Sequence, residues 1–406
     1  MRNNILLLAC LLLQLTSWGQ IVINEYSASN YNSSTDNNGE YEDWMELYNQ
    51  GGVAVDLNGY YLSDKAGNLT KFQINNSINI AGGDYLMVYA SGSGAVNADN
   101  IHTDFKITQT KGNEWWILTD PDGVTVVDSI FVRPALVNDS RGRITDGAGT
   151  WGVFNDPTPN NANNNALIEY ATTPIFSESP GFHPAAINLS ITTPDPNVDI
   201  YYTTDGSHPD DTDNLYNGPI AINNTTVIKA VAYSTDPLVH RSFIEYGTFL
   251  INTIHTVPIL SISGGQVDNL LNGNGGIEPW GSVEYFKEGV LVDKARGEFN
   301  EHGNDSWAYA QRGFDYITRD QFGYNHAIND EIFRTKERDS YQRLIIKAAA
   351  NDNYPFAYGS SGAHIRDAYV QSLSQIADLR MDERSYEPCV LFLNGEYWGL
   401  YEIREK

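Results

Sequence analysis

Short runs of alternating apolar and polar residues recur between residues 20 and 155, and polar turn clusters separate them. Alternation with a period of two is typical of a strand with one buried and one exposed face. Clusters rich in Asn, Asp and Gly, as at 49–52 and 120–123, mark turns between such strands. The pattern predicts an antiparallel β-sandwich over residues 20–155. Its alternating runs are 21–23, 44–48, 85–89, 115–118 and 124–127.

Residues 156–166 contain two prolines and five asparagines but almost no apolar side chain, which is the composition of a linker. A second all-β block follows over residues 167–253, and it predicts a second, smaller sandwich. Its expected strands are 187–191, 200–203 and 226–233.

The pattern changes in the third block, residues 257–406. Strand-like runs continue at 259–262, 344–347 and 390–393, but residues 364–377 place apolar side chains at helical spacing. This block is therefore expected to be α+β. Because the sequence stops at Lys406 directly after an apolar strand, we expect an incomplete lobe that exposes apolar surface.

The net charge of the chain limits the kinds of molecule that it is expected to bind. Lys and Arg number 25 against 51 Asp and Glu, so the formal net charge is −26. A surface this acidic repels phosphate backbones and anionic lipids, which argues against nucleic-acid binding. The sequence contains no G-x-S-x-G, H-E-x-x-H, P-loop or C-x-x-C motif.

Residues 1–19 have the pattern of a secretory signal peptide, with Arg2 ahead of a short apolar run and small residues near Gly19. Cys10 would leave with this peptide, and Cys389, in an apolar run, is expected to be a buried thiol. No later apolar run is long enough to span a membrane. We therefore expect a secreted or cell-surface protein without a transmembrane anchor or an internal disulfide.

The first block resembles the lamin-tail domain, an immunoglobulin-like sandwich. The resemblance implies an accessory module that interacts with other molecules and carries out no chemistry. Trp44, Leu47 and Leu62 are expected core anchors, and Asp64 is expected to hold a turn. The matching runs are Ile23-Asn24-Glu25, Asp43-Trp44-Met45-Glu46-Leu47-Tyr48-Asn49, Leu57-Asn58-Gly59-Tyr60-Tyr61-Leu62-Ser63-Asp64 and Ser140-Arg141-Gly142-Arg143.

The second block is similar to the C-terminal β-sandwich of chitobiase and β-hexosaminidase, through the runs 200–209 and 216–220. That sandwich is not the catalytic domain of those enzymes, so no glycosidase activity is implied. This block also contains a run of acidic residues whose carboxylate oxygens could bind calcium. Because the spacing of these residues does not match an EF-hand loop, we interpret the run as a solvated acidic loop. The acidic residues are Asp205, Asp210, Asp211 and Asp213.

The third block resembles the N-terminal part of the CotH family, the spore-coat atypical protein kinases. The resemblance rests on residues 257–262, on Ile365-Arg366-Asp367, and on the unbroken run 391–406 that contains Asn394-Gly395-Glu396-Tyr397-Trp398-Gly399. The lysine that the family commonly has after an Arg-Gly-Asn-Ser-like turn is missing from residues 311–317. That departure puts local phosphate contact in doubt.

A kinase needs cations for the phosphates and carboxylates that hold a metal. On the nucleotide side, the candidates are Lys347, Arg366, Asp367, Glu402 and Glu405. The resemblance implies ATP with Mg²⁺ or Mn²⁺ as cofactors and places the catalytic aspartates beyond Lys406. No catalytic residue and no metal ligand can therefore be named within these 406 residues.

Two hypotheses remain open. The chain is either the N-terminal portion of a secreted CotH-like kinase acting on Ser or Thr of an extracellular or envelope protein, inactive as this fragment, or a non-catalytic surface protein. In the second case the sandwich modules bind glycan or protein. The expected architecture is common to both: a mainly β multidomain chain with two immunoglobulin-like sandwiches and an incomplete α+β kinase-like lobe.

Overall fold

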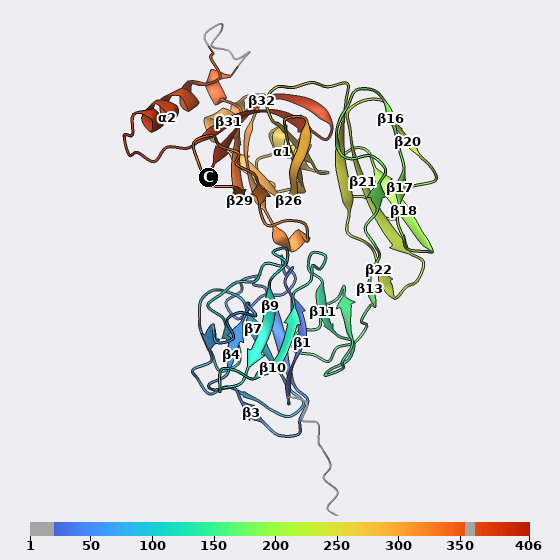
Figure 1. Cartoon of the computed structure of the whole chain (residues 1–406), viewed down its shortest axis with the longest axis vertical. Helices are drawn as coiled ribbons and strands as arrows, with labels where there is room; N and C mark the ends of the chain where they lie inside the picture. Colours follow the sequence, from blue (N-terminus) through green and yellow to red (C-terminus); the bar gives the residue numbers. More distant parts are fainter. Residues whose placement is uncertain (1–19, 354–361) are drawn as a thin grey trace, which may run out of the picture.

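The computed structural model describes residues 20–353 and 362–406, so the predicted signal peptide and Cys10 lie outside the described residues. The described chain forms three units that are built mainly from β-strands. In Figure 1 the first sandwich lies beneath the other two units, which stand beside one another. The mainly β, multidomain fold class is confirmed.

The first unit is a sandwich of a six-stranded and a four-stranded sheet, which pack through apolar inner faces. The expected anchors Trp44, Leu47 and Leu62 are all buried. The six-stranded sheet has the order β12 (Trp151–Phe154), β11 (Ser140–Arg143), β1 (Ile21–Ser27), β2 (Trp44–Asn49), β7 (Tyr85–Tyr89) and β8 (Asn100–His102). The four-stranded sheet has the order β10 (Val126–Phe131), β9 (Trp115–Thr119), β4 (Tyr61–Ser63) and β5 (Phe72–Gln73), and a short pair joins β3 (Val55–Asp56) to β6 (Asn79–Ile80).

The segment 156–166 is packed against the first sandwich by hydrogen bonds to buried polar groups of β1 and β2. Thr158 donates to the carboxylate of Glu25, and the Asn160 N–H donates to Glu46 at 2.6 Å. Asn163 is buried and donates to the carbonyl oxygen of Arg143 at 2.6 Å. The many asparagines of this segment therefore supply hydrogen bonds to a polar interior.

The second unit is built around a five-stranded sheet whose apolar face packs on shorter strand pairs. The sheet has the order β15 (Gly181–His183), β23 (Glu245–Ile251), β21 (Thr226–Ser234), β18 (Val198–Thr203) and β19 (Asn214–Leu215). The short pairs are β16 (Ile187–Leu189) with β20 (Ile220–Ile222), β14 (Ile175–Phe176) with β17 (Ile191–Thr192), and β13 (Glu169–Tyr170) with β22 (Val239–His240).

The third unit is a closed barrel around an apolar core, accompanied by helices α1 (Val267–Leu271) and α2 (Arg366–Ile376). The barrel closes where its first strand, Ile259–Ser263, pairs in parallel with the strand Tyr386–Leu393. The last strand pairs with neighbours on both of its edges, so the barrel sheet is not left open there. The barrel order is β24 (Ile259–Ser263), β25 (Trp280–Lys287), β26 (Val290–His302), β27 (Gly313–Thr318), β30 (Arg343–Lys347), β32 (Glu396–Glu405) and β31 (Tyr386–Leu393). The remaining elements are β28 (Ile328–Asn329), β29 (Ser340–Tyr341) and the 3₁₀ turns η1 (Asp305–Ala308), η2 (Asp320–Phe322) and η3 (Ala350–Asp352).

Each unit contacts both of the others. The first and second meet where Arg141 binds Glu169, with 2.9 Å between Nη2 and Oε1. The first and third meet where the side chain of Gln109 donates to the carbonyl oxygen of Asp320 at 2.7 Å. The second and third share an apolar cluster of Leu250, Ile259, Phe286, Val390 and Phe392. The three joints therefore form a closed ring of contacts.

Candidate functional site

A charged cluster lies where α2 begins, next to the ends of β30 and β32. Lys347 is the last residue of β30, and its Nζ lies 2.7 Å from Oδ2 of Asp367 in the first turn of α2. Burial acts to raise the pKa of Asp367, but the hydrogen bonds from Lys347 and Gln371, together with the charges of Lys347 and Arg404, outweigh burial and the pKa is lowered. The carboxylate is therefore ionised at neutral pH and ties the helix to the strand.

Arg404 completes the cluster from inside the protein. Its side chain is 1% exposed, and its Nη2 lies 2.6 Å from Glu402 Oε2 and 3.2 Å from Asp367 Oδ2. In the described part of the chain, Arg404 Nη1 and Glu402 Oε1 have no hydrogen-bond partner. A buried guanidinium and a buried carboxylate with unused donors and acceptors are costly, so a polar group that joined them would be stabilised.

The register of the barrel explains why these side chains meet. β30 and β32 are antiparallel, and Lys347 stands opposite Glu402. Glu402 and Arg404 are two residues apart on one strand, so their side chains share a face. The sequence therefore contained a signal for Arg404, the period of two that starts from Glu402, although it was not among the predicted site residues.

Arg366, the first residue of α2, forms an ion pair with Asp352. Its Nε lies 2.9 Å from Oδ1 of Asp352, whose other oxygen accepts the Arg366 N–H at 3.0 Å. Asp352 thus caps the N-terminus of α2 from outside the helix. Three nearby non-glycine residues, Ala349, Ala350 and His364, have positive φ angles of 58°, 48° and 63°. Such strained backbone tends to gather at functional sites.

Glu405 does not belong to the cluster. It lies on β32 next to Lys336 and Arg338, at 3.4 and 3.7 Å. Of the five predicted residues, the structure brings together Lys347, Asp367 and Glu402, places Arg366 beside them, and directs Glu405 elsewhere. Strand alternation accounts for this, because Glu405 is an odd number of residues from Glu402.

The described residues contain no group of three or more His, Cys, Asp or Glu side chains arranged to hold a metal ion. In the acidic loop of the second unit, the carboxylates are used by the loop itself. Asp205 accepts from the Ser207 N–H at 3.0 Å, and Asp210 accepts from the Thr212 N–H at 2.8 Å. These carboxylates hold turns of the loop.

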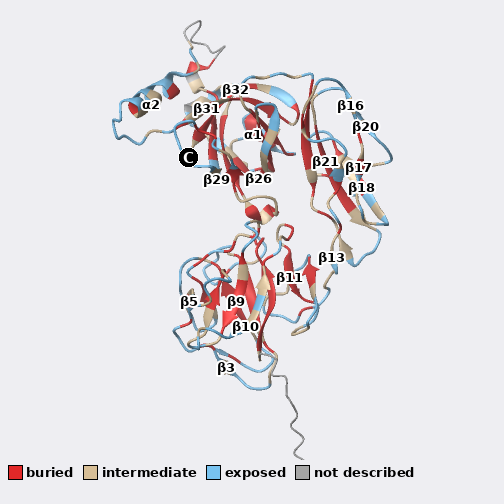
Figure 2. Cartoon of the chain, in the orientation of Figure 1, coloured by how far each residue is buried: buried red, intermediate tan, exposed pale blue. Residues whose placement is uncertain are grey.

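Helix α2 exposes apolar side chains. Ile365, Tyr369, Leu373 and Ile376 follow helical spacing along one face, yet they are between 46% and 83% exposed. Of the helix residues, Ala368 and Ser374 are buried. Figure 2 shows that much of α2 is exposed. The apolar surface expected after the last strand is not found there, because the end of β32 is buried and the strand pairs with others on both of its edges. The exposed apolar side chains lie on α2 instead, where the helical spacing did not mark a buried face.

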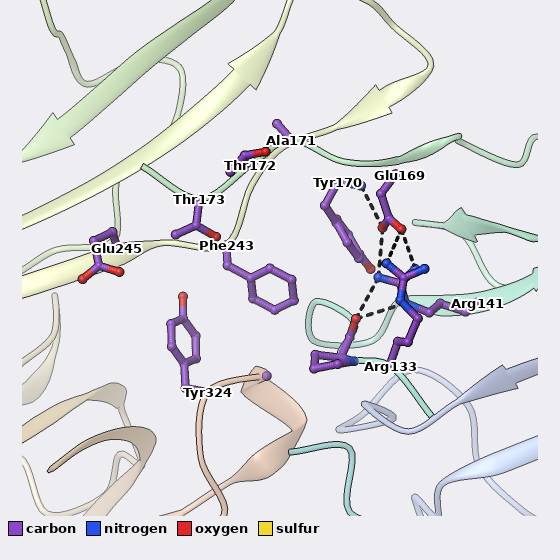
Figure 3. A pocket seen from close by; sticks show the side chains of 12 residues that line it. Arg133, Arg141, Glu169, Tyr170, Ala171, Thr172, Thr173, Phe243, Glu245 and Tyr324 are labelled. Carbon is purple, nitrogen blue, oxygen red and sulfur yellow. Dashed lines mark hydrogen bonds and ion pairs between the residues drawn. The ribbon is translucent and has the colours of Figure 1, made fainter. Parts of the chain in front are cut away.

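A cleft of about 590 Å³ opens where the three units meet. The first unit contributes Arg133 and Arg141, which converge on Glu169 of the second unit (Figure 3). Phe243 stands in the cleft between Tyr170 and Tyr324, with ring centroids 5.3 and 6.1 Å away. Junctions between units are common places for ligand sites, and aromatic walls are typical of them.

Comparisons with known families cover the first two units. A family model described as Lamin Tail Domain matches residues 15–133, and one described as Fn3 associated matches residues 189–242. No curated protein matches the chain. The chain thus carries a region similar to the lamin-tail domain and one similar to Fn3-associated sequences, consistent with an immunoglobulin-like multidomain protein. No helix among residues 20–353 and 362–406 is both long enough and apolar enough to cross a membrane.

Proposed function

We propose that the third unit is the phosphate-binding part of a secreted CotH-like protein kinase. In this proposal the complete enzyme transfers the γ-phosphoryl group of ATP to a Ser or Thr hydroxyl of an extracellular or cell-envelope protein. The observation that carries the proposal is the ion pair between Lys347 on a barrel strand and Asp367 on α2. Kinases use such a strand-to-helix pair to position a lysine against nucleotide phosphates.

The residues fit a phosphate but not a metal. Lys347 has three N–H donors, and Asp367 uses one of them, so donors remain for phosphate oxygens. Arg404 holds Asp367 in place from the protein interior and in turn is held by Glu402. Mg²⁺ or Mn²⁺ would supply charge neutralisation, but the described residues offer no cluster for it.

Equilibrium binding of ATP to the intact chain tests this proposal. We expect Lys347→Met to weaken binding about tenfold or more, since it removes one charge-assisted phosphate contact. Lys287→Met is the matched control, because Lys287 makes an equivalent 2.7 Å ion pair with Asp330 but lies on β25. Equal ATP affinity of Lys347→Met and the wild-type chain, or no ATP binding at millimolar concentration, would contradict the proposal.

A second candidate function is favoured by the cleft in Figure 3: a non-catalytic surface protein that binds glycan. Aromatic rings can stack on sugar faces, and Arg133 presents a guanidinium whose side chain is 57% exposed. Titration of the chain with neutral oligosaccharides would test it. We expect Phe243→Ala to abolish binding and Tyr201→Ala, a half-buried ring of the same unit away from the cleft, to preserve it.

A further inference from the structure

The joint between the second sandwich and the barrel has a polar half beside its apolar cluster. The loop between β18 and β19 reaches the barrel here, at the turn between β31 and β32. The approach is close: a Cβ atom on Gly206 would overlap Oδ1 of Asn394. Only glycine fits at this position, so the polar half of the joint is a tight, specific contact.

A histidine and an arginine meet in this contact. Nη2 of Arg296 on β26 lies 2.9 Å from Nε2 of His208, which follows the loop glycine. Arginine stays protonated and can only donate, so His208 must accept through an unprotonated nitrogen. The other partners of Arg296 are the hydroxyl of Tyr324 at 3.4 Å and the rings of Phe322 and Tyr324. None of these contacts supplies a negative charge that could offset a second cation.

A buried lysine adds to the positive charge. Lys229 on β21 is fully buried, and its Nζ donates to the carbonyl oxygen of Ser263 at 3.2 Å. The acid on the barrel that attracts Lys229, Glu284 of β25, accepts hydrogen bonds from the N–H of Thr248 at 3.0 Å and from its hydroxyl. Burial, followed by the repulsion of Arg296, holds the pKa of Lys229 well below its usual range.

The charged groups that face His208 all lower the pKa of its imidazole. Burial lowers its pKa first, and the charges of Arg296, Lys229 and Arg241 lower it further. Around Lys229, Asp205 and Glu284 provide the opposing negative charge. The pKa of Glu284 is itself raised by burial, so its contribution to stability decreases as the pH rises. A test must therefore isolate the contribution of His208.

We propose that protonation of His208 in mildly acidic medium loosens the polar half of this joint, so that the second sandwich is held firmly on the barrel only at neutral and alkaline pH. A protonated imidazole would place a second cation against the Arg296 guanidinium and would lose the hydrogen bond. Because the folded-state pKa of His208 lies below the ordinary value of 6.5, the open state binds more protons in acid. The stabilisation is complete above about pH 6.5 and decreases as the pH falls below it.

Hydrogen exchange of the intact chain, corrected for intrinsic exchange rates, tests the proposal at pH 7.5 and 5.5. We compare the wild-type chain with His208→Gln, whose side-chain oxygen can still accept from Arg296. The matched control is His183→Gln, on β15 of the same unit. In the wild-type chain and the control, we expect protection in β21, β26 and the β18–β19 loop to decrease by up to about tenfold per pH unit below 6.5. We expect His208→Gln to lack this decrease.

The same pH dependence in His208→Gln and the wild-type chain would overturn the proposal. If His208→Gln does not fold, the titration of His208 in the wild-type chain, followed by NMR of its imidazole C–H, gives the answer. A midpoint well below 6.5 supports the proposal, and a midpoint at or above 6.5 overturns it.

Discussion

The stability of the first sandwich is expected to fall as the pH rises, because two glutamates face one another inside its sheet. Glu25 and Glu46 are direct partners on β1 and β2, and both are completely buried. Burial raises the pKa of Glu46 to about 8 from its ordinary value of 4.5, with Glu25 adding repulsion. Between these values, the folded chain holds a proton that the unfolded chain has released. Stability therefore decreases as the pH rises from about 4.5 to 8.

The size of the effect follows from the change in pKa. A rise from 4.5 to about 8 corresponds to about 5 kcal/mol, at about 1.4 kcal/mol per pH unit. Glu25 shares the buried site, so a proton can be held by either carboxyl group and part of the effect remains when one is removed. For Glu46→Gln, which stays neutral, we expect a gain of about 2–4 kcal/mol relative to the wild-type chain between pH 5 and 8.5.

Native-state hydrogen exchange in β1 and β2 of the intact chain measures this difference. The Glu46→Gln variant would lose one of the acceptors that Glu46 offers to Asn24 and to the Asn160 N–H, but that cost does not depend on pH. The exposed Glu40→Gln is the control and should follow the wild-type chain. If the wild-type stability is constant or increases from pH 5 to 8.5, or if Glu46→Gln has the wild-type slope, the reasoning is wrong.

Three further predictions concern the barrel. Leu391→Ala removes a fully buried core side chain and should destabilise the third unit by about 2–5 kcal/mol in denaturant unfolding; a loss below about 1 kcal/mol would mean that the core is loosely packed. Gly297→Ala would make a Cβ overlap the carbonyl oxygen of Ile317, between β26 and β27, so we expect lower soluble yield and a lower melting temperature, and wild-type behaviour would contradict the close approach. Burial, with the charges of Glu402 and Glu387, raises the pKa of the Cys389 thiol, so a thiol reagent at pH 8 should label Cys389 only after unfolding; labelling of Cys389 in the native chain, located by peptide mapping, would show that the barrel opens.

Local pattern located the strands β1, β2, β7 and β9 of the first sandwich and three buried side chains, Trp44, Leu47 and Leu62. It missed short strands such as β8 and β11, and alternation did not mark a single buried face, because β1 is buried along its whole length. Local pattern was also not sufficient for the turn after Leu62. We expected Asp64 to hold that turn, but its carboxylate binds Lys71 at 2.6 Å, and the Ser63 hydroxyl accepts the Lys65 N–H instead. Asp64 and Ser63 can both stabilise a turn through their side chains. Which of them does so here depends on Lys71, because this lysine binds the Asp64 carboxylate.

In the candidate site too, local sequence pattern identified individual residues but did not predict contacts between residues that are distant in sequence. Lys347 and Asp367 were identified from their positions on a strand and at a helix start, but their pairing depends on how α2 packs. Lys229 was predicted only as one residue of an alternating strand, and nothing in that pattern indicates that it is buried against the barrel. Contacts between units depend on surfaces that are distant in sequence, which local periodicity does not report.

The closed ring of joints has a consequence for how such a chain can evolve. Modules joined end to end can be gained, lost or exchanged one at a time, because each contacts only its sequence neighbours. Here the first sandwich and the barrel touch directly through Gln109 and Asp320, although the second sandwich separates them in sequence. Deleting the second sandwich would therefore expose partner surfaces on both remaining units at once. Replacing one unit by an unrelated module would therefore require compensating changes on both of the others.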